Sequence, residues 1–251
     1  MIKANTKAHA AIVIIGNEIL SGRTQDLNVS FLSKWLNDLG VRVIEVRIIE
    51  DSEESIIKCI NEVRKKYKYV FTTGGIGPTH DDITSKSISK AFKLKYDFHK
   101  EAYDILEKYY TREKFNEGRK KMAKIPAGAA LIYNPSSAAP GFIVKNVFCL
   151  PGVPSILKSM IGDISNKIAG GKKILNKTIS VQTVESEISK SLEKVQNKFE
   201  KTVEIGSYPF FRLGKIGVSI VIRSTEKNMI DVCYQEIINF LEKKKLNIIE
   251  R

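Results

Sequence analysis

The sequence predicts an α/β protein with a three-layer, mostly parallel sheet, followed by a second, smaller α+β domain. Apolar runs suited to strands alternate with segments of helical spacing in the first part of the chain. Glycine-rich turns follow several of these runs, as expected where ligands bind at the carboxyl ends of parallel strands. From Lys172 onward the order of elements changes. We therefore expect one domain at residues 1–171 and an accessory domain at residues 172–251.

The first domain opens with three predicted strands joined by helices. A helical face from Leu27 to Leu39 ends at Gly40, a residue type that commonly terminates helices. Ser52 is suited to cap the next helix. Because strand and helix alternate, right-handed crossovers should place helices on both faces of a parallel sheet. The three strands are expected at residues 9–15, 41–48 and 69–72.

A further strand is expected at residues 147–150, followed by a helix. Pro154 suits the first turn of that helix, and Gly170 with Gly171 is expected to end it.

The accessory domain has a strand, helix, strand, strand, helix order that resembles half of a ferredoxin-like sandwich. This domain is expected to form one wall of the substrate site. Within it, residues 206–211 contain a Gly-Ser turn and several aromatic side chains. Packing of Phe210 and Phe211 in the core is the favoured interpretation, and stacking on an adenine or flavin ring is the alternative. The elements are expected at residues 177–181, 185–199, 203–208, 216–223 and 229–244.

Residues 72–82 form the most informative segment, a glycine-rich turn between a strand and a helix that carries two carboxylates. Gly74, Gly75 and Gly77 allow backbone N–H groups to approach an anion closely. Asp81 and Asp82 beside a phosphate require a divalent cation or a role as base. The alternative is a tight turn in which one aspartate caps the helix near Ile83. The segment matches neither a Walker loop nor a Rossmann fingerprint.

Other polar residues follow neighbouring strands and should reach the same rim of the sheet. Glu18 comes after the first strand and is expected to bind metal or water near the aspartates. Ser136 and Ser137 lie in a turn where hydroxyls bond the backbone or, alternatively, a phosphate. His80 is interpreted as a loop histidine. No Ser-His-Asp or Cys-His arrangement supports a covalent mechanism.

Five segments together resemble the molybdopterin-binding (MoCF biosynthesis) domain, which has a MogA-like fold, in the branch typified by the amino-terminal domain of CinA. Residues 15–22 are similar to its G-[DN]-E-[IL]-L-x-G motif, and residues 74–84 match G-G-[LI]-G-P-T-x-D-D-x-T without a gap. Leu27 stands where a Thr usually precedes Asn28, and Ser137-Ala138 stand where many members have Gly-Thr. The other matching segments are residues 125–129, 134–142 and 150–154.

This resemblance, which covers about residues 8–170, implies a hydrolase that cleaves the diphosphate of ADP-ribose or FAD to release AMP. It implies a divalent metal cofactor (Mg, Mn or Co), bound by Asp81 and Asp82, with Glu18 as a further catalytic residue, and a homodimer. The family's deamidase domain has no counterpart here, so only the first activity is expected. The implied substrate-binding residues are Gly16, Asn17, Asn28, Gly74, Gly75, Gly77, Pro78, Thr79, Ser136, Ser137, Pro140, Gly141, Pro151 and Gly152.

Two other functions stay open. The wider family uses the same rim for pterin phosphate, which implies a molybdopterin-binding or adenylyl-transferring protein. A noncatalytic, competence-associated nucleic-acid-binding protein is the third possibility. The net charge of +13 favours nucleic acid, but the basic residues are mostly Lys, spread along the chain without a recognition motif, so nucleic acid is not the expected partner.

The composition is that of a globular protein, with 251 residues, 43% of them hydrophobic and 27% charged. The longest apolar runs fall short of the roughly 20 residues needed to cross a bilayer, and no signal peptide is recognised, so we expect a cytoplasmic protein without membrane partners. Cys59, Cys149 and Cys233 lack metal-site spacing and are expected to be reduced core thiols.

Overall fold

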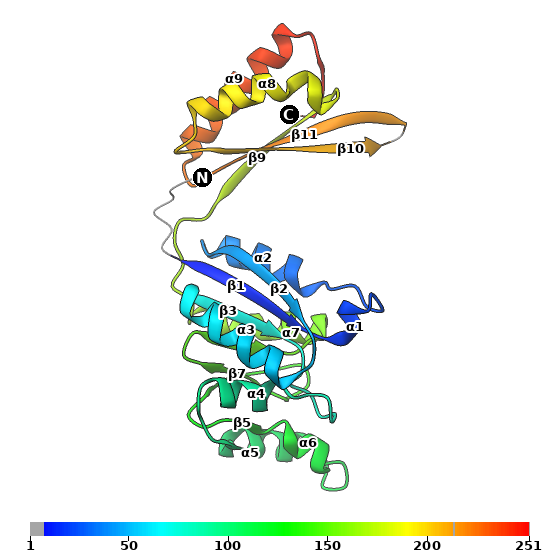
Figure 1. Cartoon of the computed structure of the whole chain (residues 1–251), viewed down its shortest axis with the longest axis vertical. Helices are drawn as coiled ribbons and strands as arrows, with labels where there is room; N and C mark the ends of the chain where they lie inside the picture. The colour runs from blue at the N-terminus through cyan, green and yellow to red at the C-terminus, as the bar shows by residue number, and fades with distance from the viewer. Residues whose placement is uncertain (1–7, 213, 251) are drawn as a thin grey trace. The chain divides into compact units, whose positions relative to one another are not determined.

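The computed structural model describes residues 8–212 and 214–250, which form two compact units (Figure 1). One unit comprises Ala8–Gly170, and the other begins at Gly171. The expected domains, 1–171 and 172–251, also contain residues 1–7, 213 and 251, which lie outside the described residues.

The first unit is built on a six-stranded sheet with the order β2-β1-β3-β8-β7-β6. Strands β2, β1, β3 and β8 run parallel, whereas β7 pairs antiparallel with both β8 and β6. The prediction of a mostly parallel α/β sheet is therefore confirmed. The strands are β1 His9–Ile15, β2 Arg42–Ile49, β3 Tyr69–Thr73, β6 Ala130–Ile132, β7 Gly141–Val144 and β8 Val147–Leu150; β4 Tyr96–Phe98 and β5 Lys124–Pro126 form a separate antiparallel pair.

Helices cover both faces of this sheet and make three layers (Figure 1). On one face, α2 and α7 bury Leu32 and Leu157 against Ile12. On the other, α3, α4 and α5 pack around Val13 and Val70. Both faces of β1 are thus buried, which explains why its sequence is continuously apolar. The helices of this unit are α1 Asn17–Leu20, α2 Asn28–Asp38, α3 Glu53–Lys66, α4 Thr84–Ala91, α5 Lys100–Tyr109, α6 Glu117–Lys121 and α7 Pro154–Ser165.

Two local features of this unit follow from specific side chains. Ser52 caps α3 as predicted, because its hydroxyl oxygen accepts a hydrogen bond from the Ser55 N–H at 3.2 Å. Trp35, the only tryptophan in the sequence, meets Phe71 of β3 edge-on, with ring centroids 5.9 Å apart.

Helix α7 begins at Pro154 as predicted but ends earlier than expected. Its last residue is Ser165, so the prediction that Gly170 and Gly171 terminate it is wrong. After the helix the chain is held against β3, where the Tyr69 hydroxyl accepts a hydrogen bond from the Ala169 N–H at 2.8 Å.

The second unit is a four-stranded antiparallel sheet with the order β10-β11-β9-β12. Helices α8 and α9 pack on it around Ile179, Ile220 and Ile237. The smaller α+β domain is confirmed, but its last strand, β12, was not predicted. With β12 the unit has the complete βαββαβ order of a split sandwich. Its elements are β9 Leu175–Gln182, α8 Glu185–Lys198, β10 Glu204–Arg212, β11 Lys215–Ser224, α9 Lys227–Lys243 and β12 Asn247–Glu250.

The aromatic segment of this unit lies at the end of the β10–β11 hairpin. Strand β9 pairs with β11 only from Val218 onward, so the hairpin continues past the rest of the sheet (Figure 1). Phe211 is 72% exposed, and Phe210 lies half-buried across Gly217. The interpretation that both pack in the core is wrong, because the core cluster of the unit stops short of this part of the ribbon.

None of the helices in the described segments combines the length and apolar character needed to cross a membrane.

Candidate functional site

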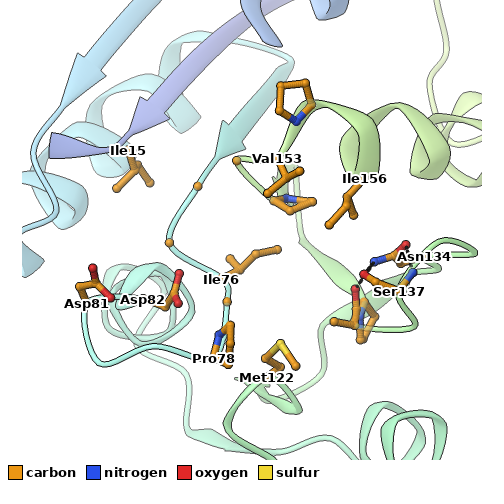
Figure 2. A pocket seen from close by; sticks show the side chains of 18 of the residues that line it. Ile15, Ile76, Pro78, Asp81, Asp82, Met122, Asn134, Ser137, Val153 and Ile156 are labelled. Carbon is orange, nitrogen blue, oxygen red and sulfur yellow. Dashed lines mark hydrogen bonds between the residues drawn. The ribbon is translucent and has the colours of Figure 1, made fainter. Parts of the chain in front are cut away.

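A cavity of about 750 Å³ lies where β1, β3 and β8 end (Figure 2). The loops after these strands contribute Glu18, the segment Gly74–Pro78 and the segment Pro151–Pro154 to its lining. Their carboxyl ends meet at one rim because the three strands are parallel neighbours.

Gly74 allows the first of these loops to turn sharply. Its φ of 101° lies in the left-handed region, and a Cβ there would be 2.2 Å from the carbonyl oxygen of Ile15. Its N–H donates to the Leu150 carbonyl at 3.0 Å. Gly74 therefore gives the loop its path, while its amide is used within the protein instead of facing a ligand.

The following residues present free amides. Thr84, at the start of α4, binds two loop carbonyls: its N–H donates to Gly75 at 2.9 Å and its hydroxyl to Gly74 at 3.0 Å. Within the described residues, the N–H groups of Gly75, Ile76 and Gly77 make no hydrogen bond. Three neighbouring donors beside a cavity suit an anion.

Asp81 and Asp82 converge on the side chain of Thr79. The Thr79 Oγ1 lies 2.5 Å from Asp81 Oδ1 and 2.6 Å from Asp82 Oδ2. A hydroxyl has one hydrogen, so it can donate to one of these carboxylates at a time. The hydrogen bond from Thr79 lowers the pKa of Asp81 below its usual value, which favours the ionised form.

The two aspartates do not cap helix α4. Its N-cap residue is Ile83, and no side chain accepts a capping hydrogen bond there. The alternative interpretation, that one aspartate is simply a helix cap, is therefore wrong. Asp82 instead accepts the Thr79 N–H at 2.8 Å, which closes the loop on itself.

Two more carboxylates line the cavity. Glu18 folds back over Gly16, where a Cβ would lie 2.6 Å from Glu18 Oε1. Asp51, which lies in the loop after β2, accepts the Asn17 N–H at 2.7 Å. Asp51 was not among the predicted site residues, although a carboxylate beyond the carboxyl end of a parallel strand was a usable signal.

The donor set fits a hard divalent cation only in part. In the described ranges, 8–212 and 214–250, no group of three or more His, Cys, Asp or Glu is arranged to hold a metal ion. Asp81 and Asp82 alone provide two carboxylates at one place. That suits Mg²⁺, which is usually held by one or two carboxylates together with water and substrate phosphates.

Part of the cavity wall comes from the α5–α6 segment, and this contribution was not predicted. Arg119 stacks on Tyr110, with the guanidinium carbon 4.2 Å from the ring centroid, and its Nη1 donates to the Lys114 carbonyl. Among the described residues that line the cavity, Arg119 alone is basic. Arg119 was not singled out in the sequence, because it is one of many basic residues along the chain.

The loop after β6 is organised by Asn134, whose hydrogen bonds are drawn in Figure 2. Its Nδ2 donates to Ser137 Oγ at 2.7 Å and to the Ala139 carbonyl at 2.9 Å. Its Oδ1 accepts the N–H groups of Ser136 and Ser137. The local bonds in this turn therefore come mainly from Asn134, a residue that was not among the predicted site residues.

An apolar strip separates the acidic side of the cavity from the Asn134 loop. In Figure 2, Ile76, Val153 and Ile156 lie between Asp82 and Ser137, with Met122 below them. The cavity thus combines amide donors, carboxylates and an apolar surface.

The predicted site residues divide into two groups. Several lie away from the lining, among them Asn28, which is 3% exposed and donates to the Gly152 carbonyl at 2.7 Å. The lining contains Glu18, Gly74, Gly75, Gly77, Pro78, Asp81, Asp82, Ser137, Pro140, Pro151 and Gly152; outside it are Gly16, Asn17, Asn28, Thr79, Ser136 and Gly141.

Comparison with known proteins matches each unit to a protein family. The family described as probable molybdopterin binding domain matches residues 11–169, and the family described as FAD synthase, middle domain, matches residues 173–249. A protein of Archaeoglobus fulgidus is 34% identical over 216 residues, which cover 86% of this chain and 91% of that protein. A protein of Saccharolobus solfataricus is 34% identical over 202 residues, which cover 76% of this chain and 74% of that protein.

A solved structure resembles the first unit. The crystal structure of CinA from Thermoplasma acidophilum is 30% identical in sequence, with a TM-score of 0.61, and the match covers 64% of this chain and 98% of that chain.

Proposed function

Because the chain belongs to the CinA-type branch of the molybdopterin-binding domain family, we propose that it is a metal-dependent nucleotide pyrophosphatase that cleaves ADP-ribose or FAD and releases AMP. The match of its second unit to the FAD synthase middle domain supports a nucleotide substrate, in particular a flavin nucleotide.

The observation that carries the proposal is the position of three free amides beside two convergent carboxylates. Gly75, Ile76 and Gly77 offer donors to phosphate oxygens. Carboxylates next to a phosphate repel it unless a cation lies between them. The donors that Asp81 and Asp82 meet in the loop are the neutral hydroxyl and N–H of Thr79, so the two carboxylates keep their charge and suit a cation.

Each residue then has a defined task. The amides and Arg119 bind and orient the diphosphate, and Asp81 with Asp82 holds the cation. A bound divalent cation supplies Lewis-acid polarisation of the phosphoryl oxygen and lowers the pKa of water. Glu18, on the same rim, orients the attacking water and accepts its proton. Water oxygen bonds to phosphorus as the anhydride bond breaks, which leaves two monophosphates.

The cavity is large enough for this substrate class. Its 750 Å³ lies within the range of about 300–1,000 Å³ that is usual for small-molecule sites. Ile76, Val153 and Ile156 provide an apolar surface for part of a nucleoside. Binding of the nucleoside portions would hold the anhydride in place for attack, an advantage that a simple phosphomonoester lacks.

The decisive experiment is chromatography of products after incubation with ADP-ribose or FAD and Mg²⁺, Mn²⁺ or Co²⁺. We expect AMP and a second monophosphate, with the reaction abolished by chelation. AMP offered alone should remain intact. Formation of no AMP with any of the three metals would contradict the proposal.

A second candidate is favoured by the family match itself, whose description names molybdopterin. The same three amides would then bind the phosphate of the pterin. Binding of a pterin, or transfer of an adenylyl group to it, without release of AMP from dinucleotides would favour this function.

A further inference from the structure

A second cavity, of about 630 Å³, lies beside the first in the same unit. It is bounded by Glu101 of α5, by Tyr133, and by Gly162 and Asp163 of α7. Asn134 belongs to the lining of both cavities. The loop that follows Asn134 contributes to both cavities. Ser137 and Ala139 line the first cavity, and Pro135 and Ala138 line the second.

The hydroxyl and N–H groups that line the second cavity donate their hydrogens to other groups of the protein. The Tyr133 hydroxyl donates to Glu101 Oε1 at 2.5 Å, and its N–H donates to Asp163 Oδ2 at 3.1 Å. The Ser159 hydroxyl donates to the Ile156 carbonyl, and the Ala138 N–H donates to Asn134. What these groups still offer is acceptors: carboxylate oxygens and hydroxyl lone pairs.

This makes the second cavity the chemical complement of the first. The first has free amides and Arg119, which attract an anion. The carboxylates of Glu101 and Asp163 accept hydrogen bonds from hydroxyl groups, as acidic residues do at ribose sites, although Asp163 also pairs with the ammonium group of Lys167 at 3.1 Å. Ile105, Pro135 and Ala138 add apolar surface for the C–H groups of a sugar.

We propose that the second cavity is a subsite for the vicinal hydroxyls of the substrate's sugar, the terminal ribose of ADP-ribose or the ribityl chain of FAD. Glu101 and Asp163 accept the hydroxyl hydrogens, and the substrate passes from the first cavity to the second along Asn134, which lines both. The inference rests on the proposed function, because it requires the diphosphate to occupy the first cavity.

Gly162 gives a direct way to block this subsite. It lies in α7, and no atom outside the helix backbone lies within 4 Å of a Cβ built on it. The position therefore has room for a Cβ, so Gly162→Leu adds bulk at the cavity lining, and Gly162→Ala is the matched control, since alanine also favours the helix. Glu101→Gln is a second variant that keeps the shape but removes the charge.

The measurement is calorimetric binding, in Mg²⁺, of α,β-methylene analogues of ADP-ribose and ADP, which the enzyme cannot hydrolyse. Wild type and Gly162→Ala should bind the ADP-ribose analogue more tightly than the ADP analogue. In Gly162→Leu and Glu101→Gln, affinity for the ADP-ribose analogue should fall about tenfold or more, with that for the ADP analogue unchanged. The same losses for an α,β-methylene FAD analogue would extend the subsite to ribityl.

Two other results overturn the inference in different ways. If all four proteins bind the ADP-ribose analogue equally, the subsite is wrong and the proposed function stands. If the wild type binds neither analogue, the first cavity is not a diphosphate site, and both proposals fail.

Discussion

The side-chain amide of Asn28 on α2 donates a 2.7 Å hydrogen bond to the Gly152 carbonyl, which ties this helix to the loop after β8. Asn28→Ala would leave that carbonyl without its partner, so we expect a loss of about 1–2 kcal/mol in the free energy of unfolding. Because Gly152 lines the cavity, KM should also rise. Chemical denaturation and steady-state kinetics test this, with Ser30→Ala on the exposed side of α2 as control. Unchanged stability would refute the structural role.

Gly74 and Gly22 form a matched pair of glycines with positive φ. A Cβ on Gly22 meets nothing within 4 Å, so Gly22→Ala should cost only the backbone penalty of about 1–2 kcal/mol. A Cβ on Gly74 would lie 2.2 Å from the Ile15 carbonyl oxygen. Gly74→Ala should therefore cost at least about 1–3 kcal/mol more in the free energy of unfolding. Equal losses in urea denaturation would show that the close approach to Ile15 is unimportant.

Asp81→Asn removes a charge from the proposed cation site and keeps the size of the side chain. We expect turnover with metal to fall on the order of 10²-fold or more, while the thermal midpoint stays unchanged. Asp82→Asn should lose activity too. Asp231→Asn in the second unit is the control and should keep full turnover. Full activity in both Asp81→Asn and Asp82→Asn would remove these residues from the mechanism.

Glu45 should make the first unit sensitive to acid. It accepts hydrogen bonds from Tyr67 at 2.5 Å, Arg47 at 2.6 Å and Lys66 at 3.0 Å, which lower its pKa from 4.5 to about 2. Since the folded state holds the lower pKa, this stabilisation is complete above pH 4.5 and is lost as the pH falls toward 2.

Glu45→Gln removes the titrating group, so the free energy of unfolding should be lower at pH 7 and should fall less steeply between pH 4.5 and pH 2. Urea denaturation across this range measures the effect. Glu107→Gln, at an exposed position of α5, should keep the wild-type slope. If the Glu45→Gln slope equals that of wild type, the interactions of Glu45 do not contribute.

The regular elements were the predictable part of the fold. Strands β1, β3 and β8 are buried on both faces, so their apolar runs are visible in the sequence. The strand β12 was missed because its four residues alternate in burial only weakly, and its position depends on pairing with the distant β9. The exposed Phe211 was misread because composition does not show where a hairpin leaves its sheet.

The rim of the site was predictable for a topological reason. Loops that follow parallel strands must meet, and Glu18, Gly75 and Gly152 all line one cavity. Tyr110 and Arg119 were not predictable in this way. They come from the α5–α6 segment, and no local periodicity indicates that this segment folds back over the rim.

The edge-on contact of Trp35 with Phe71 makes the tryptophan a spectroscopic marker for the first unit. Emission excited at 295 nm arises from the first unit alone, because the sequence contains no other tryptophan. Far-ultraviolet circular dichroism, in contrast, reports the helices of both units. The difference between the two melting curves therefore measures how far the βαββαβ unit unfolds independently, without cutting the chain.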